Sequence, residues 1–214
     1  MTAIETLAMF LAEGLRVPVA TRTNAQRHLT DTVGAWVAGA ATQEGRALLA
    51  FRPSGEIDVG TPSALARLSE IDNIHLASVT TPGGIVIPAA LTLAAARGAD
   101  GVALTRAIVA GVEAMVRLGL AIDGPQVIYR GIWPTYFAAP FGTAAVAAQL
   151  YGFDAKQTAH TLALALTFAA SGVGHHNAAT TSRWFAIAQA RPRPPESPSA
   201  PGSPSWSGAP RTRA

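Results

Sequence analysis

Two residue types suited to proton transfer stand close together in Ile71-Asp72-Asn73-Ile74-His75. A carboxylate followed three residues later by an imidazole, at the end of a predicted helix, can act as an acid and base pair on one substrate. The alternative is structural: Asp72 caps the turn that follows, and His75 is a half-buried polar residue. Asp72 and His75 are the candidate catalytic residues.

Hydroxyl groups follow in Thr80 and Thr81, directly before Pro82-Gly83-Gly84. A threonine can hydrogen-bond a substrate oxygen, but it does not titrate near neutral pH. The two glycines let the backbone approach a ligand closely or simply allow a tight turn, and the turn is the simpler explanation. Thr80 and Thr81 are therefore candidates for substrate binding rather than for proton transfer.

Aromatic and cationic candidates complete the set. Trp133 and Tyr136 stand at a predicted helix start, where Tyr136 could donate a hydrogen bond; the alternative is that both are large core residues. His175-His176-Asn177 lies in a predicted loop bounded by glycines. Adjacent histidines point in different directions, which makes a shared metal site a poor interpretation. We interpret the segment as a loop that lines the cleft. Arg183 can grip a carboxylate through two parallel hydrogen bonds or lie on the surface. Trp133, Tyr136, His175 and Arg183 are candidate substrate-binding residues, and we expect no metal site.

The elements that would position these residues are helical. Apolar residues recur at helical spacing nearly throughout, and the best β-branched run, Gly84–Ile87, is too short for a strand. The glycines at 34 and 39 lie inside one predicted helix and suggest close packing of its backbone against a neighbour. We therefore expect an all-α protein, with helices over 2–15, from 23 or 24 to 41, from 61 to 71, and over 88–96, 102–120, 136–150 and 155–170.

Composition narrows the class of protein. Hydrophobic residues make up 49% of the 214 residues and charged residues 14%, which predicts a folded chain with a substantial core. Four arginines and one glutamate in residues 191–214 account for the whole net charge of +3. Residues 1–190 are formally neutral and have no basic face, so we expect no nucleic-acid partner.

Cellular location follows from cysteine usage and hydropathy. The chain has no cysteine, which fits a reducing compartment, and Met1–Arg16 carries two glutamates where a signal peptide would be basic and then apolar. Three long uncharged stretches are rich in Ala, Gly and Thr rather than in Leu, Ile and Phe. Buried helices explain these stretches better than membrane spans do. We expect a cytoplasmic protein that does not enter a membrane.

Two segments resemble the MmgE/PrpD family of lyases, which includes 2-methylcitrate dehydratase and cis-aconitate decarboxylase. They are SEIDNIHLASVTTPGGIVIPAALTLA, at 69–94, and GIWPTYFAAPFGTAAVAAQLYGFDAKQTAHTLALALTFAASG, at 131–172. The resemblance implies an all-helical domain. Family members are about twice this length, add a smaller α/β domain, usually form homodimers and mostly need no metal or organic cofactor. Their substrates are small carboxylic acids.

The resemblance also assigns roles to particular positions. Asp72 falls in the aspartate cluster of the family. Thr81 and Trp133 stand where relatives carry histidines, and Arg183 stands where they carry a lysine. These departures argue against the dehydratase and decarboxylase reactions themselves. They leave open another elimination, isomerisation or decarboxylation of a carboxylic acid.

The composition changes abruptly after Ala190, at RPRPPESPSAPGSPSWSGAPRTRA. A segment of this kind cannot bury enough apolar surface to order itself, so we expect a disordered tail over 191–214. We interpret it as the product of a shifted reading frame in GC-rich DNA; the alternative is a natural proline-rich tail that binds a partner.

We therefore interpret residues 1–190 as an incomplete helical domain of an MmgE/PrpD-like lyase, with little or no turnover by this chain alone. The alternative is a non-catalytic helical protein that dimerises with an intact paralogue.

Overall fold

Helices make up the regular structure of the computed structural model, which describes residues 1–51 and 57–169. These residues contain no strand, only an isolated bridge between His75 and Thr80, so the prediction of an all-α fold is confirmed for them. The predicted tail lies outside the described residues. The elements in chain order are α1 (Ala3–Met9), η1 (Phe10–Gly14), α2 (Val19–Ala40), α3 (Gln43–Ala50), α4 (Gly60–Leu68), α5 (Gly83–Arg97), α6 (Gly101–Ala121), α7 (Gly124–Val127), η2 (Ile128–Arg130), α8 (Pro134–Tyr151) and α9 (Ala155–Leu166).

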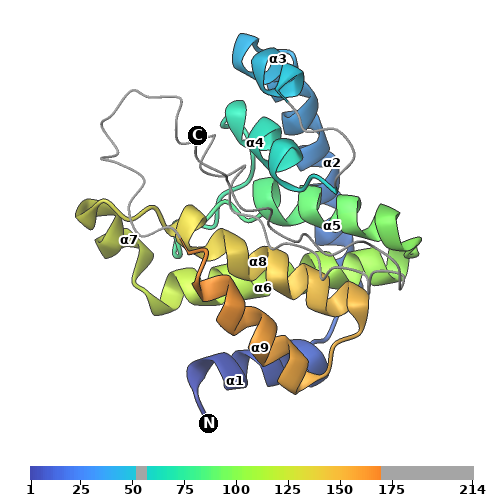
Figure 1. Cartoon of the computed structure of the whole chain (residues 1–214), viewed down its shortest axis with the longest axis vertical. Helices are drawn as coiled ribbons and strands as arrows, with labels where there is room; N and C mark the ends of the chain where they lie inside the picture. The colour runs from blue at the N-terminus through green and yellow to red at the C-terminus, as the bar shows by residue number, and fades with distance from the viewer. Residues whose placement is uncertain (52–56, 170–214) are drawn as a thin grey trace, which may run out of the picture.

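Helix α8 runs through the middle of the molecule, beside α5 and α6 (Figure 1). Most of its residues are buried, and apolar residues lie on all of its sides, as expected of a central helix. Glycines let its neighbours come close. A Cβ on Gly111 of α6 would lie 2.7 Å from Val86 Cγ1 and 2.8 Å from Val146 Cγ2, and one on Gly142 would lie 2.6 Å from Met115 Cγ.

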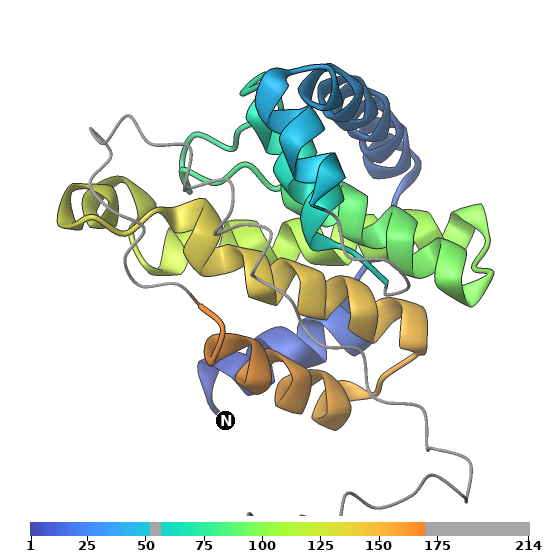
Figure 2. The same ribbon diagram turned by 45° about the horizontal axis from the view of Figure 1, so that its top comes forward.

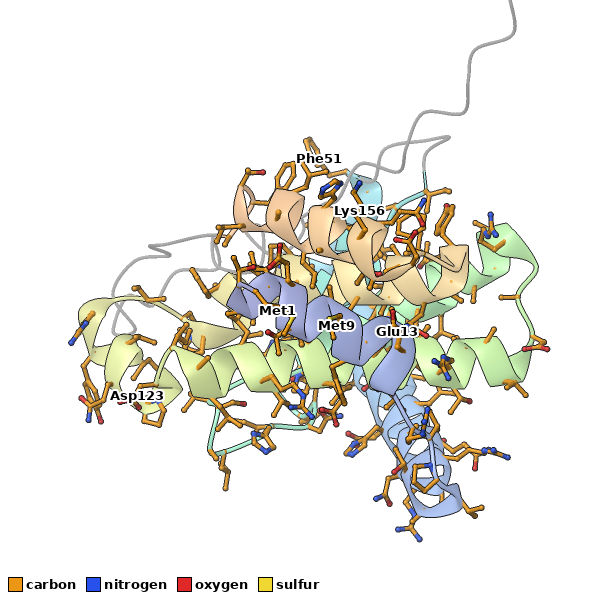
Figure 3. The ribbon with its side chains drawn as sticks, turned by 90° about the horizontal axis from the view of Figure 1, so that it is seen from below. Met1, Met9, Glu13, Phe51, Asp123 and Lys156 are labelled. Atoms are coloured by element: carbon orange, nitrogen blue, oxygen red, sulfur yellow. The ribbon has the colours of Figure 1, made fainter. Side chains whose placement is uncertain are left out.

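Helices α1 and α9 lie side by side (Figures 2 and 3), and α9 and η1 contact α8. A polar bridge fixes this layer to the centre. The Nε–H of Arg106 donates to Gln149 Oε1 at 2.7 Å, and Gln149 Nε2 donates to the carbonyl oxygen of Leu11 at 2.8 Å. One glutamine side chain thus joins α6, α8 and η1.

Helices α2, α3 and α4 form the opposite end of the molecule (Figure 1). Helix α2 contacts α4 at Gly39, where a Cβ would collide with the carbonyl oxygen of Leu65. Gly34 in the same helix has open space where its Cβ would be. The expectation of close backbone packing is therefore confirmed for Gly39 and wrong for Gly34.

Two predicted helix starts are wrong. Helix α2 begins at Val19, directly after Pro18, rather than at residue 23 or 24. Helix α5 begins at Gly83 rather than at Pro88, which lies inside it. An interior proline removes one backbone hydrogen bond and crowds the carbonyl group four residues earlier, and the burial of the apolar residues on both sides of Pro88 offsets this cost. Helix α3 was not expected from the sequence.

In the part of the chain that the structure describes, no helix has both the length and the apolar character needed to cross a bilayer.

The two glycines of α2 give a matched test of the packing. Gly39→Ala is expected to lower the free energy of unfolding by about 1–3 kcal/mol, because the new methyl group overpacks the contact with α4. Gly34→Ala should raise it by about 0.5–1 kcal/mol, because alanine favours the helix and meets open space. Urea unfolding of both variants measures the difference. Equal effects at the two positions would contradict this packing.

Candidate functional site

The loop between α4 and α5, residues 69–82, carries most of the sequence candidates. Its second half is closed by a bridge in which the N–H of His75 donates to the Thr80 carbonyl oxygen at 2.8 Å and the N–H of Thr80 donates back to His75 at 3.4 Å. Glu70 and Val79 have φ of 52° and 51°. Positive φ is costly for a β-branched residue such as valine, so the surrounding contacts must hold the loop in a strained conformation.

The loop rests on the end of α6 and the turn that follows. A Cβ on Gly119 would lie 2.8 Å from both Ser78 Cβ and Thr80 Cγ2, and one on Gly124 would collide with the Ser78 carbonyl oxygen. Asp123, at the α7 end of the molecule (Figure 3), also has positive φ, 55°. Every non-glycine residue with positive φ in the described ranges therefore belongs to this loop or to the turn beneath it.

Asp72 forms a buried ion pair with Arg67 of α4. Arg67 is 5% exposed, and the side chain of Asp72 has no exposed area. Gly84, in the first turn of α5, makes room for the pair: its Cβ would lie 2.6 Å from Asp72 Oδ2 and 2.7 Å from Arg67 Cδ. Gly83 and Gly84 therefore belong to a helix rather than to the expected turn, and Gly84 serves the close approach of these two side chains.

Burial raises the pKa of the Asp72 carboxyl above its usual range. The charge and the hydrogen bond of Arg67 oppose this effect without cancelling it, and the nearby charge of Glu70 adds to it. Arg67 donates to Oδ1, whereas the buried Oδ2 accepts no hydrogen bond. Oδ2 is thus the oxygen that can take a proton without losing a partner.

Asn73 ties the loop to α5 and α2. The N–H of Gly83 donates to Asn73 Oδ1 at 3.2 Å, which makes the amide Nδ2 the group that faces His28 Nδ1 at 3.1 Å. An amide nitrogen can only donate, so Nδ1 of His28 is the acceptor. The first turn of α5 is therefore capped by a side chain ten residues earlier in the sequence.

His75 has different partners from Asp72. Its Nδ1 lies 2.9 Å from Ser78 Oγ, which in turn lies 2.7 Å from Thr80 Oγ1. His75 is exposed, whereas Ser78 and Thr80 are fully buried. The two candidate catalytic residues thus share one loop, but they are held by separate groups, Arg67 and Ser78.

Thr81 joins the loop to the start of α8. Its N–H donates to Thr135 Oγ1 at 3.1 Å, and the two hydroxyl oxygens are hydrogen-bonded at 3.1 Å. Nearby, the rings of Trp133 and Tyr136 stack with centroids 5.9 Å apart, and Tyr136 is 3% exposed. The structure thus brings the two family-like segments together, and it places the Tyr136 ring in the core.

His175 and Arg183 lie outside the described residues. Within 1–51 and 57–169, no three His, Asp or Glu side chains gather as a metal site would require. Sequence reasoning missed Arg67 and Thr135. Arg67 could have been found from the sequence, because it follows Ser-Ala-Leu-Ala, residues that a helix would bury. A charged residue among buried residues needs a buried partner.

These features define an all-helical domain with an acid–base candidate enclosed at a helix junction. The model of the MmgE/PrpD N-terminal domain matches residues 61–193, more than half of the chain. The protein therefore belongs to the MmgE/PrpD family, and the matched range contains both the Arg67–Asp72 pair and the contact between Thr81 and Thr135. No curated protein matches the sequence.

Asp72→Asn is expected to change how stability depends on pH. Because folding raises the pKa of Asp72, the stability linked to this group is fully present below its unfolded pKa, about 3.9, and is lost as the pH rises through the folded pKa. Asparagine does not titrate. Above about pH 4, the free energy of unfolding of the variant relative to wild type should therefore rise with pH, and it should level off once the pH has passed the folded pKa.

Urea unfolding at each pH measures this difference. A relative stability that falls as the pH rises would show instead that Arg67 outweighs burial and lowers the pKa.

Thr135→Val is expected to destabilise the protein by about 1–3 kcal/mol, because it leaves the buried N–H of Thr81 without its acceptor. Thr143→Val is the matched control in the same helix. The Thr143 hydroxyl donates only to the Ala139 carbonyl oxygen, which keeps its helical bond, so the cost should be about 1 kcal/mol or less. Thermal or urea unfolding compares the two, and equal losses would contradict the role of Thr135.

Proposed function

We propose that this chain supplies the helical acid–base part of an MmgE/PrpD-like lyase that dehydrates, decarboxylates or isomerises a small carboxylic acid, with Asp72 as a proton-transfer group. Membership of the family supports the reaction class. The observation that carries the assignment to Asp72 is its carboxyl, enclosed at the junction of α4 and α5 with one oxygen bound to Arg67 and the other unpartnered.

Elimination beside a carboxylate needs a base that removes a proton from carbon and an acid that protonates the departing hydroxyl. An ordinary aspartate is too weak a base and is rarely protonated at neutral pH. Burial raises the pKa of Asp72, which moves its proton affinity toward the range in which one group can both accept and donate. The raised pKa therefore suits Asp72 to either half of the reaction.

The enclosure of Asp72 limits what the described residues can do alone. Its side chain has no exposed area, so a substrate reaches it only when loop 69–82 moves. The hydroxyl of Thr81 is already hydrogen-bonded to Thr135, and the matching family model is that of an N-terminal domain. We therefore propose that turnover requires groups beyond this domain and that the chain alone turns over little substrate.

The remaining features predicted from the sequence and from the resemblance are part of the same proposal. They are a cytoplasmic homodimer, no metal or organic cofactor, His75 as the second catalytic residue, and substrate contacts from Thr80, Thr81, Trp133, Tyr136, His175 and Arg183. Exposed aliphatic side chains in the loop, Ile71, Ile74 and Leu76, provide apolar surface that a second copy could cover.

Proton exchange tests the assignment even where full turnover is low. The purified chain is incubated in D₂O with a panel of hydroxy-dicarboxylates and hydroxy-tricarboxylates, and loss of the proton beside the carboxylate is followed by NMR. We expect slow exchange of at least one acid, and Asp72→Asn should reduce its rate by about 10²–10⁴-fold, the usual contribution of a general base.

Asp154→Asn is the control, because asparagine still caps α9 and the position lies outside the site. Equal exchange by wild type and Asp72→Asn, or no exchange of any acid, would contradict the proposal. Saturable steady-state turnover of a hydroxy-tricarboxylate would overturn the expectation of low activity.

A further inference from the structure

We propose that Arg67 is a positioning residue: its guanidinium fixes the Asp72 carboxyl in place and sets how tightly that carboxyl holds its proton. The catalytic importance of this arrangement rests on the proposed function of Asp72. The physical effect itself is a property of the resting protein and needs no substrate.

The position of Arg67 in the fold excludes a surface role. Arg67 lies in the last turn of α4, directly after the buried Ala64, Leu65 and Ala66, and is itself 5% exposed. Asp72 lies beyond the end of the same helix, and the loop turns back so that its carboxylate meets the guanidinium. An arginine keeps its charge when buried, so a permanent positive charge sits beside the carboxyl.

The charges around Asp72 leave Arg67 as the main group that favours its ionised form. Burial and the nearby Glu70 both raise the pKa of Asp72, while Arg67 lowers it through its charge and its hydrogen bond. Helix α5 approaches Asp72 at Gly84, which carries no charge. From α2, the titratable residue near this loop is His28, which is hydrogen-bonded to Asn73. Without Arg67, little would counteract the effect of burial on the pKa of Asp72. The carboxyl would then stay protonated to higher pH.

The asymmetry of the pair favours a tuning role over a purely structural one. A buried ion pair is weak evidence for stability, since apolar residues of similar volume often do as well. Here Oδ1 is held by Arg67, while Oδ2 faces Gly84 and accepts no hydrogen bond. One oxygen is thus anchored and the other is left to gain or lose a proton.

The test is a titration of Asp72 by NMR in the full chain, with ¹³C at the carboxyl carbons of its six aspartates. The Asp72 signal is the one that Asp72→Asn removes. In Arg67→Met, which keeps the volume but not the charge, the titration midpoint is expected to shift upward from its wild-type value. Arg67→Lys keeps a charge without the planar fork, and its midpoint should fall between the other two.

Arg117→Met is the matched control, because it removes a half-exposed arginine that pairs with Glu113 on α6. It should leave the midpoint of Asp72 unchanged. An unchanged midpoint in Arg67→Met, or a lysine midpoint at or above the methionine one, would overturn the inference.

If Arg67→Met does not fold, a titration of the wild-type chain still tests the proposal. The Arg67 guanidinium signals should then shift with the same midpoint as the Asp72 carbon, and signals that ignore that titration would overturn the proposal. Failure of the lyase function would look different. In that case no acid would exchange its proton in D₂O, but the Arg67 and Asp72 signals would still titrate together.

Discussion

The close approach of α5, α6 and α8 at small residues is the constraint on which the rest of this structure depends. Gly111 and Gly142 leave room for the side chains of Val86, Val146 and Met115 between these helices. Because α8 is buried around its whole circumference, its start is fixed, and Thr135 is held beneath loop 69–82. Packing in the centre of the molecule thus fixes the geometry of the candidate site.

The site itself is a junction at which helix termini meet a strained loop. The end of α4 supplies Arg67, the first turn of α5 supplies Gly84, and the loop between them supplies Asp72. Desolvation and the guanidinium act on this carboxyl in opposite directions, and desolvation has the larger effect. The Asp72 carboxyl therefore holds its proton more tightly than an exposed aspartate does, although a guanidinium lies beside it.

The sequence predicted the helical fold because apolar spacing and proline and glycine signals are local. It also singled out Asp72, and its resemblance to the MmgE/PrpD family is confirmed by the family model. It could not predict the start of α5, since the cap comes from Asn73, ten residues away. Arg67 was missed for a similar reason: its partner lies beyond the end of its helix, and local periodicity carries no information about such contacts.

The fit of Gly84 against Asp72 has an evolutionary consequence. Any side chain at position 84 would displace Oδ2 of Asp72 and the stem of Arg67, so these three positions cannot vary independently. A lineage that exchanged Asp72 and Arg67 for smaller apolar residues would release position 84 from glycine, and the larger side chain could then fill the space left behind. Positions 67, 72 and 84 are therefore expected to change together. Relatives that have lost the buried charges should carry a residue larger than glycine at position 84.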